Sequence, residues 1–332
     1  MSPRERRRQE SEPIRAGVVG VGHMGRYHVA AYAELFDVEL AGVADIRRDL
    51  AREMADRYGT RAFTDYRDLL GRVDVVSVAV PTSRHVPIAR EFLEAGVHVL
   101  VEKPICQDLE EARELFRLAG ERGVALHVGH VERFNGAVQE LKKIVQDPIL
   151  IECRRLGPFV PRVQDDGVVL DLMIHDLDIL LNLVEEEVVE VRGAGSSIFG
   201  EREDVATAFL RFAGGCVATV TASRATQEKI RTLAITQRGA YIFLDYTSQD
   251  IRIHRRASSE HTLTREELKY RQESLIERVF VHRENPLKLE LKHLIHEARN
   301  GRRPVDVEKE LRSLVLAQDI LRLIPAGAPA SA

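Results

Sequence analysis

Few of the features that mark a secreted, membrane-bound or nucleic-acid-binding protein are present. The 332-residue chain has three cysteines, Cys106, Cys153 and Cys216, which lie far apart and are odd in number. They argue against a disulfide framework or a zinc knuckle and fit the reducing cytoplasm. No apolar run approaches the ~20 residues of a membrane helix. A formal net charge of −4 offers no attraction to nucleic acid or to an anionic membrane.

An arginine run at residues 6–8 resembles the start of an export signal. Polar residues 9–12 follow it where such a signal would have an apolar region. We therefore expect residues 1–13 to form a disordered, charged tail.

Apolar residues make up 44% of the chain, which is ample for a packed core. The length suggests about two domains of ~150 residues. In residues 14–131, helical stretches alternate with expected strands at 16–19, 38–44, 73–80, 97–101 and 125–128. Because these strands show little polar alternation, they indicate a parallel sheet covered on both faces. This is the doubly wound α/β arrangement known as the Rossmann fold.

Residues 132–325 show a different pattern, in which apolar and polar residues alternate. The expected strands are 150–156, 188–199, 205–212, 216–222, 230–237, 241–245 and 251–254. They indicate an α+β domain with a large, open and mainly antiparallel sheet, whose exposed face would be an oligomer interface. The last helices, 286–300 and 307–323, would be free to pack back on the first domain.

The turn after the first strand is the most informative segment. In Gly20-x-Gly22-x-x-Gly25, the first glycine allows a tight turn and the second lets backbone N–H groups approach a pyrophosphate. The third lets helix and strand pack closely. The segment predicts a dinucleotide site whose loop contacts are Gly20, Gly22, His23, Met24 and Gly25.

Asp45 ends the second expected strand, 20 residues after Gly25. A carboxylate at this place can accept both hydroxyls of an adenosine ribose, which favours NAD. Arg47 and Arg48 follow directly and could hold a 2′-phosphate instead, so NADP stays open.

Two further clusters follow strands of the same sheet, at the carboxyl ends where open α/β sheets bind ligands. Pro81, Thr82 and His85 follow strand 73–80 and could line the nicotinamide ribose. Glu102-Lys103-Pro104 follows strand 97–101, and a lysine enclosed there could exchange a proton with a substrate hydroxyl. Taken alone, these residues have ordinary explanations: a helix cap at Thr82 and a solvated lysine at 103.

Asp171 and His175 lie four residues apart in an expected helix, 169–183, and so share one face. Apolar residues bury the rest of this helix, so the two polar groups need partners, which a sugar could supply. A hydrogen-bonded core histidine is the alternative. His127 and His130 could be drawn with them as a metal site, but the four residues come from unrelated segments. We therefore predict no metal and assign these side chains to a polar cleft.

Together, GVGHMGRYH (residues 20–28), Glu102-Lys103-Pro104 and Asp171-x-x-x-His175 resemble the Gfo/Idh/MocA family of NAD(P)-dependent sugar and inositol dehydrogenases. The likeness covers nearly the whole chain after residue 13. It implies that Lys103 is catalytic, with Glu102 beside it at the cofactor, and that His175 and Asp171 form a substrate-binding acid/base pair. It also implies that the second domain mediates oligomerisation, as a homodimer or homotetramer.

Two stretches, 129–135 and 157–171, look most like a nucleotide-sugar branch whose members oxidise C3 of UDP-N-acetylglucosamine. This likeness adds Arg133, Asn135 and Arg162 to the expected substrate-binding residues. Asp165 and Asp166 depart from it, since their charge would repel a diphosphate. Arg162, Arg155 or Arg224 would have to compensate.

The expected activity is NAD-dependent oxidation of a secondary sugar hydroxyl, with Lys103 or His175 as the proton acceptor. A dehydrogenase for inositol or a free sugar is one alternative. A non-catalytic NAD(P)-binding regulator is the alternative from another class.

Overall fold

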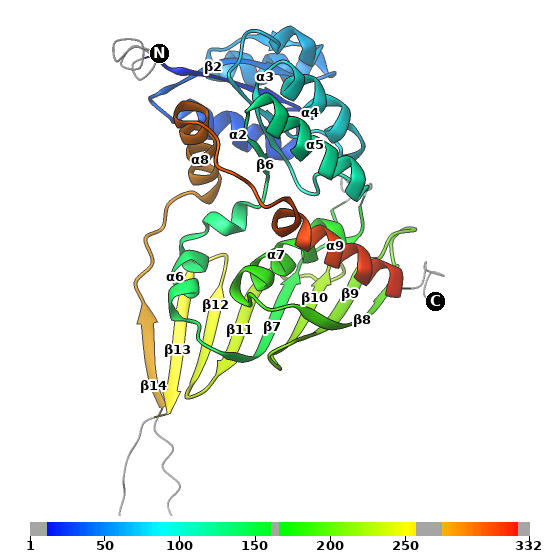
Figure 1. Ribbon diagram of the computed structural model, residues 1–332, viewed down its shortest axis with the longest axis vertical. Coiled ribbons are helices and arrows are strands. Elements are labelled where there is room, and N and C mark those ends of the chain that lie inside the picture. The colour runs from blue at the N-terminus through cyan, green and yellow to red at the C-terminus, as the bar shows by residue number, and fades with distance from the viewer. Residues whose placement is uncertain (1–11, 161–165, 257–273, 325–332) are drawn as a thin grey trace, which may run out of the picture. The chain divides into compact units, whose positions relative to one another are not determined.

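The computed structural model describes residues 12–160, 166–256 and 274–324 (Figure 1). These residues divide into two compact units. The first contains the chain up to Phe134 together with Glu284–Val315, and the second contains Asn135–Arg283 and the chain from Leu316 onward. Residues 1–11 of the expected tail lie outside the described ranges.

A parallel sheet forms the centre of the first unit. Its six strands lie in the order β3-β2-β1-β4-β5-β6, and each neighbouring pair is parallel. The strands are β1 (Ile14–Val19), β2 (Val38–Ala44), β3 (Ala62–Phe63), β4 (Val75–Val78), β5 (His98–Val101) and β6 (Leu126–Val128). This order confirms the predicted Rossmann sheet, because strands are added on one side of β1 up to β3 and on its other side from β4 onward.

Helices connect these strands: α2 (His23–Ala33), α3 (Arg48–Tyr58), α4 (His85–Glu94) and α5 (Leu109–Arg122). Short 3₁₀ turns add η1 (Tyr66–Leu69), η2 (Thr82–Arg84) and η3 (Val131–Phe134). Local residues set the helix ends. The Asp108 carboxylate accepts the Glu110 and Glu111 N–H groups at the start of α5, and Gly123 ends the helix with φ +70°.

A helix from late in the sequence completes the first unit. α8 (Pro286–Asn300) begins after Asn285, whose side chain accepts the N–H groups of Leu287 and Lys288. Its apolar side chains join one core cluster with residues of α2 and the sheet, including Leu287, Leu291, Leu294, Val29, Val75 and Leu100. α8 therefore covers the Rossmann sheet beside α2, although it begins 158 residues after the end of β6 at Val128.

The second unit is built on an eight-stranded sheet in the order β14-β13-β12-β11-β7-β10-β9-β8. Its pairs are antiparallel except β7 with β10. The strands are β7 (Pro148–Leu156), β8 (Val188–Ser196), β9 (Val205–Phe212), β10 (Val217–Ser223), β11 (Ile230–Gln237), β12 (Ala240–Asp245), β13 (Asp250–Arg256) and β14 (Ser274–Val279). The prediction of a mainly antiparallel sheet is confirmed. β14 was missed, since Leu275 and Ile276 are both exposed on this edge strand and give no alternation.

One face of this sheet is buried and the other is open. Along β9, Ala206, Ala208 and Leu210 are fully buried, whereas Thr207 is exposed and contacts Thr221 of β10 at 3.1 Å between hydroxyl oxygens. The unit also contains α6 (Gly136–Ile144), the π-helical turn η4 (Val169–Met173) and α7 (Ile174–Leu183). α9 (Val307–Leu323) contains the boundary between the units. Within the described ranges, no helix is both long enough and apolar enough to cross a membrane.

Candidate functional site

Packing requires glycine at two of the three positions in the β1–α2 turn. Gly20 has φ +82°, and a Cβ there would lie 2.6 Å from the Ala79 carbonyl oxygen. A Cβ on Gly25 would lie 1.8 Å from the carbonyl oxygen of Gly20, so α2 could not approach the turn with any side chain at that place. These two glycines fix the shape of the loop.

Gly22 is glycine for a different reason. A Cβ there would have one heavy atom within 4 Å, an Arg47 guanidinium nitrogen at 3.9 Å. Within the described part of the chain, packing therefore does not require a glycine at this position. Gly22 is also the N-cap of α2, whose helix dipole favours negative charge. The open space and the helix end fit the pyrophosphate of a dinucleotide, and His23 and Met24 form the first turn beneath it.

The carboxylate of Asp45 ties the glycine loop to the end of β2. Its Oδ2 accepts the Val21 N–H at 2.9 Å and its Oδ1 accepts the Arg47 N–H at 2.9 Å. Asp45 is 9% exposed, while the Arg47 side chain is 58% exposed. A buried carboxylate held beside the loop is suited to accept the hydroxyl groups of an adenosine ribose.

His85 joins the loops that follow β4 and β5. Its Nδ1 lies 2.9 Å from the Pro104 carbonyl oxygen and its Nε2 lies 2.9 Å from that of Val80. Burial lowers the pKa of His85, and these two carbonyl contacts oppose that effect. Both ring nitrogens already contact backbone, so His85 acts by holding the two loops. The Lys103–Pro104 peptide bond is cis.

Beside these loops, Pro81 is exposed and Thr82 is buried. A cavity of about 270 Å³ opens there, lined by Thr82, Ser83, Val86, Pro87, Cys106, Gln107, Asp108 and Glu111. Lys103 is not among these residues, so the loops after β4 and β5 define the candidate reaction site better than this cavity does.

A buried hydrogen-bond chain lies directly beneath Lys103. The Glu102 Oε1 atom is 2.8 Å from His28 Nε2, and His28 Nδ1 is 3.0 Å from Ser77 Oγ, which in turn contacts the Tyr32 hydroxyl at 3.1 Å. Burial would raise the pKa of Glu102, but the hydrogen bond and charge of His28, with help from Lys103, bring that pKa below its ordinary value. Glu102 is therefore a buried anion that fixes the backbone at Lys103.

Sequence reasoning missed this chain. His28 and Tyr32 lie four residues apart on α2, and this spacing on one helix face was the available signal. Their partners, Ser77 of β4 and Glu102 after β5, could be recognised only once the sheet had brought them together.

The cofactor residues predicted from the sequence thus belong to one unit and follow the carboxyl ends of β1, β2, β4 and β5. Lys103 is half-buried among them. Asp171 and His175 are also half-buried and belong to the second unit. The expected single helix of residues 169–183 is a π-helical turn that contains Asp171, followed by α7 with His175. Such π-helical turns occur frequently at functional sites.

Two of the three arginines expected to offset Asp165 and Asp166 have other partners. Arg155 is 1% exposed and makes two 2.9 Å hydrogen bonds to Asp176. Arg224 is buried against Asp204 and the Asp166 carbonyl oxygen. Neither guanidinium is available to a diphosphate in this arrangement. Arg162 and Asp165 lie outside the residues whose structure is described.

The remaining substrate candidates also have local partners. Arg133 Nη1 lies 2.6 Å from Glu310 Oε2 of α9. The Asn135 side chain accepts the Ala137 N–H at 3.0 Å, capping α6, and is 3% exposed. Arg133 and Asn135 lie close to the point in the sequence, after Phe134, where the first unit ends and the second begins. Their contact with substrate stays a prediction.

Comparison with known proteins agrees with this architecture. Residues 14–130 match the family described as an oxidoreductase family with an NAD-binding Rossmann fold, and residues 138–242 match the GFO/IDH/MocA C-terminal domain. The sequence is 40% identical to the UDP-N-acetylglucosamine 3-dehydrogenase of Acidithiobacillus ferrooxidans over 246 residues, which is 74% of this chain and 78% of that protein.

The solved structure of that enzyme has a TM-score of 0.83 and 35% identity, over 94% of this chain and 97% of its own. The myo-inositol 2-dehydrogenase of Thermotoga maritima is 29% identical over 229 residues, which is 64% of this chain and 69% of the relative. These similarities cover both units of the chain.

Proposed function

We propose, from the premise that this chain belongs to the Gfo/Idh/MocA family of NAD-binding oxidoreductases, that it oxidises a secondary hydroxyl of a nucleotide sugar. The substrate we propose is UDP-N-acetylglucosamine, with oxidation at C3 to the 3-keto sugar. The observation that carries the proposal is the position of Lys103. Lys103 follows the carboxyl end of β5, and the glycine loop and Asp45 follow the carboxyl ends of other strands of the same sheet. The chain is also 40% identical to a UDP-N-acetylglucosamine 3-dehydrogenase.

The protein's own residues would position the reactants and move one proton. Bound NAD supplies the hydride acceptor. The open space at Gly22 and the carboxylate of Asp45 would hold the pyrophosphate and ribose. Lys103 or His175 would accept the hydroxyl proton, and Asp171 would position the sugar ring or orient His175.

A smaller substrate, inositol or a free sugar, is the second candidate. It is favoured by the buried pairs Arg155–Asp176 and Arg224–Asp204, which remove two cations from the set that could bind a diphosphate. The 29% identity to a myo-inositol 2-dehydrogenase points the same way. A non-catalytic regulator has no comparable support.

The test is NADH formation, followed at 340 nm, with UDP-N-acetylglucosamine, N-acetylglucosamine, myo-inositol and methyl glucoside as substrates. We expect the highest kcat/KM with the nucleotide sugar. Lys103→Ala should lower kcat by at least about a hundredfold, the lower range for a general base, while NADH affinity stays within a few-fold. Lys143→Ala, which changes an exposed lysine of α6, is the matched control.

Three outcomes would count against the proposal. Turnover of inositol or a free sugar with none of the nucleotide sugar would select the second candidate. Full activity of Lys103→Ala would remove Lys103 as proton acceptor and leave His175→Asn to be compared. NADH binding without turnover of any of these substrates would favour a regulator.

We also propose that the open face of the eight-stranded sheet joins copies of this chain into a homodimer or homotetramer. Tyr241 of β12 and Thr207 of β9 are exposed there, and extended sheet surfaces of this kind are common interaction sites. Sedimentation equilibrium measures the oligomeric state, and a monomer would contradict this part of the proposal.

A cytoplasmic location is also part of the proposal. The three cysteines are free and buried, which supports it.

A further inference from the structure

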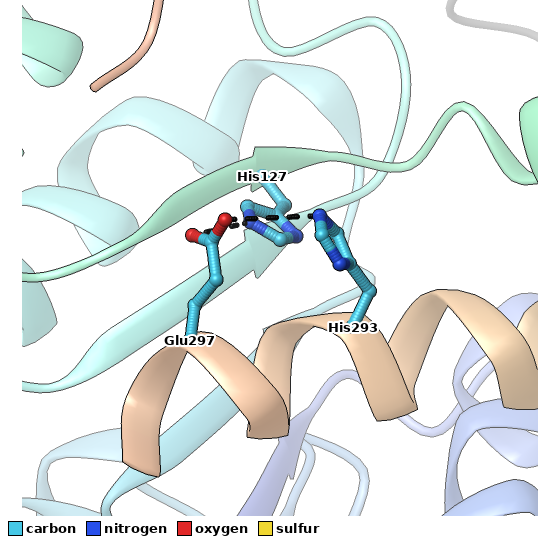
Figure 2. Close-up of side chains that lie close together, drawn as sticks. All are labelled: His127, His293 and Glu297. Atoms are coloured by element: carbon cyan, nitrogen blue, oxygen red, sulfur yellow. Dashed lines mark hydrogen bonds and ion pairs between the residues drawn. The ribbon is translucent and has the colours of Figure 1, made fainter. Parts of the chain in front are cut away.

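Two imidazoles and a carboxylate meet between α8 and β6, the edge strand of the Rossmann sheet (Figure 2). His127 Nε2 lies 3.2 Å from Glu297 Oε2, and His293 Nε2 lies 3.7 Å from Glu297 Oε1. One ligand atom from each residue lies within 4.8 Å of the other two. Glu297 is 4% exposed, so its carboxylate is placed where an anion requires a cationic or hydrogen-bonding partner.

The secondary structure explains why these three side chains converge. His293 and Glu297 are four residues apart on α8 and therefore share one helix face. His127 is the central residue of β6 and is paired in register with Leu100 of β5, which belongs to the core cluster beneath α8. Because directly paired residues point to the same face of a sheet, His127 is directed toward α8, as Figure 2 shows.

We infer that His127, His293 and Glu297 form a binding site for a divalent transition-metal ion of the zinc class. Two imidazoles and one carboxylate are a donor set that zinc uses. At zinc-to-ligand distances of about 2.0–2.2 Å, tetrahedral ligand atoms lie about 3.3 Å apart. The two histidine-to-carboxylate separations, 3.2 Å to Oε2 and 3.7 Å to Oε1 of Glu297, are close to that value, and one ligand atom from each of the three residues lies within 4.8 Å of the other two. The fourth position is left to a water molecule.

This site joins α8 to the edge of the sheet. The apolar contacts of α8 include Val75, Leu100 and Ala125, and the metal would add a polar link from the same helix to His127 of β6. A metal that binds the folded state alone stabilises it by an amount that grows with the logarithm of the metal concentration above Kd. The predicted role is therefore structural, and the expected readout is unfolding, independent of any activity at Lys103.

The rings of His127 and His293 are stacked, with centroids 5.1 Å apart. Two states of the three-residue cluster have to be distinguished. In one, a metal bridges all three side chains. In the other, Glu297 serves as an ion-pair partner for histidine and nothing more. Arg303 contributes positive charge near the cluster, but it is exposed and its field is weakened by solvent and salt.

The test is titration of the full-length, tag-free protein, stripped with chelator, by Zn²⁺ and Co²⁺ in the presence of millimolar Mg²⁺. Calorimetry gives stoichiometry and affinity, the Co²⁺ absorption spectrum reports tetrahedral coordination, and thermal unfolding gives the shift in Tm. We expect one ion per chain, a tetrahedral Co²⁺ spectrum and a higher Tm with Zn²⁺. His293→Gln should weaken binding more than about tenfold, because the loss of an outer-shell partner alone has an effect of about that size.

His296→Gln is the matched control, because His296 lies on the same helix, is exposed and has its Nδ1 atom 3.1 Å from the side-chain nitrogen of Asn300. It should bind the metal as the wild type does. If His293→Gln fails to fold by circular dichroism, His127→Gln or Glu297→Gln takes its place. Less than one ion per chain, or equal binding by the His293 and His296 variants, would leave the ion pair alone and overturn the inference.

Discussion

Alanine at Gly22 and alanine at Gly25 should have different effects, although both glycines belong to one motif. A methyl group at residue 22 meets its nearest heavy atom, on Arg47, at 3.9 Å. The unliganded fold can therefore accept it, at a cost of up to about 1 kcal/mol for alanine in place of a better N-cap. A methyl group at residue 25 would lie 1.8 Å from the Gly20 carbonyl oxygen, a distance that requires the backbone to move.

The effect on cofactor binding follows from the same geometry. At Gly22 the methyl would occupy the space in which the pyrophosphate approaches backbone N–H groups, and a hydrogen bond to a charged group contributes about 1.5–3 kcal/mol. We therefore expect Gly22→Ala to weaken NADH binding about ten- to a hundredfold. Gly25→Ala should also destabilise the protein by about 1–3 kcal/mol or more, as overpacking does. Gly20 cannot relax to absorb it, since its own φ is +82°.

NADH fluorescence titration measures the affinity, and urea unfolding without cofactor measures the stability. The expected result is a separation: Gly22→Ala keeps nearly wild-type stability with weaker NADH binding, while Gly25→Ala loses both. Gly59→Ala serves as a control for the backbone effect of removing a glycine, because Gly59 ends α3 at φ +66° with nothing near its Cβ position. NADH affinity of Gly22→Ala equal to wild type would refute the assignment of this loop to the pyrophosphate.

Two further predictions concern buried charges. Asp176→Asn should lower the free energy of unfolding by about 3–5 kcal/mol, because it leaves the buried Arg155 without its counter-ion. The double variant Arg155→Met/Asp176→Leu should recover much of this loss, as measured by urea unfolding. A double variant no more stable than Asp176→Asn would contradict the reasoning. Glu102 has a folded-state pKa below its ordinary 4.5, so its stabilisation is complete above that value and is lost as the pH falls through the lower folded pKa. Glu102→Gln, which keeps an acceptor for His28, should therefore flatten the decline of stability below pH 4.5, and an unchanged acid limb would exclude Glu102 as its source.

Local signals in the sequence were sufficient for many elements. The predicted bounds of the α8 helix, 286–300, and of β9, 205–212, are those of the structure. Asn285 and Pro286 mark the start of α8 as its N-cap and first residue, and apolar residues at every second position from Ala206 to Phe212 mark β9. In both cases the decisive interactions lie within a few residues along the chain.

What the sequence did not reveal depends on contacts between distant segments. The partner of His28 is 74 residues away at Glu102, and the partner of His127 is 170 residues away at Glu297. The π-helical turn at Asp171 was also missed, since its residues are ordinary helix formers with the apolar spacing of an α-helix. Arg155 and Arg224 were considered for substrate because a sequence gives the charge of a side chain and not its burial.

The two candidate proton acceptors, Lys103 and His175, share a structural arrangement that their sequence motifs do not predict. Lys103 follows Glu102, and His175 precedes Asp176; both neighbours are buried carboxylates bound to a side chain from another element, His28 in one case and Arg155 in the other. Lys103 and His175 themselves are only half-buried. Each buried pair fixes the backbone beside a candidate acceptor, and preorganisation of this kind is what proton transfer at a defined position needs. Substitution of Glu102 or Asp176 should therefore lower kcat through the position of the neighbouring residue.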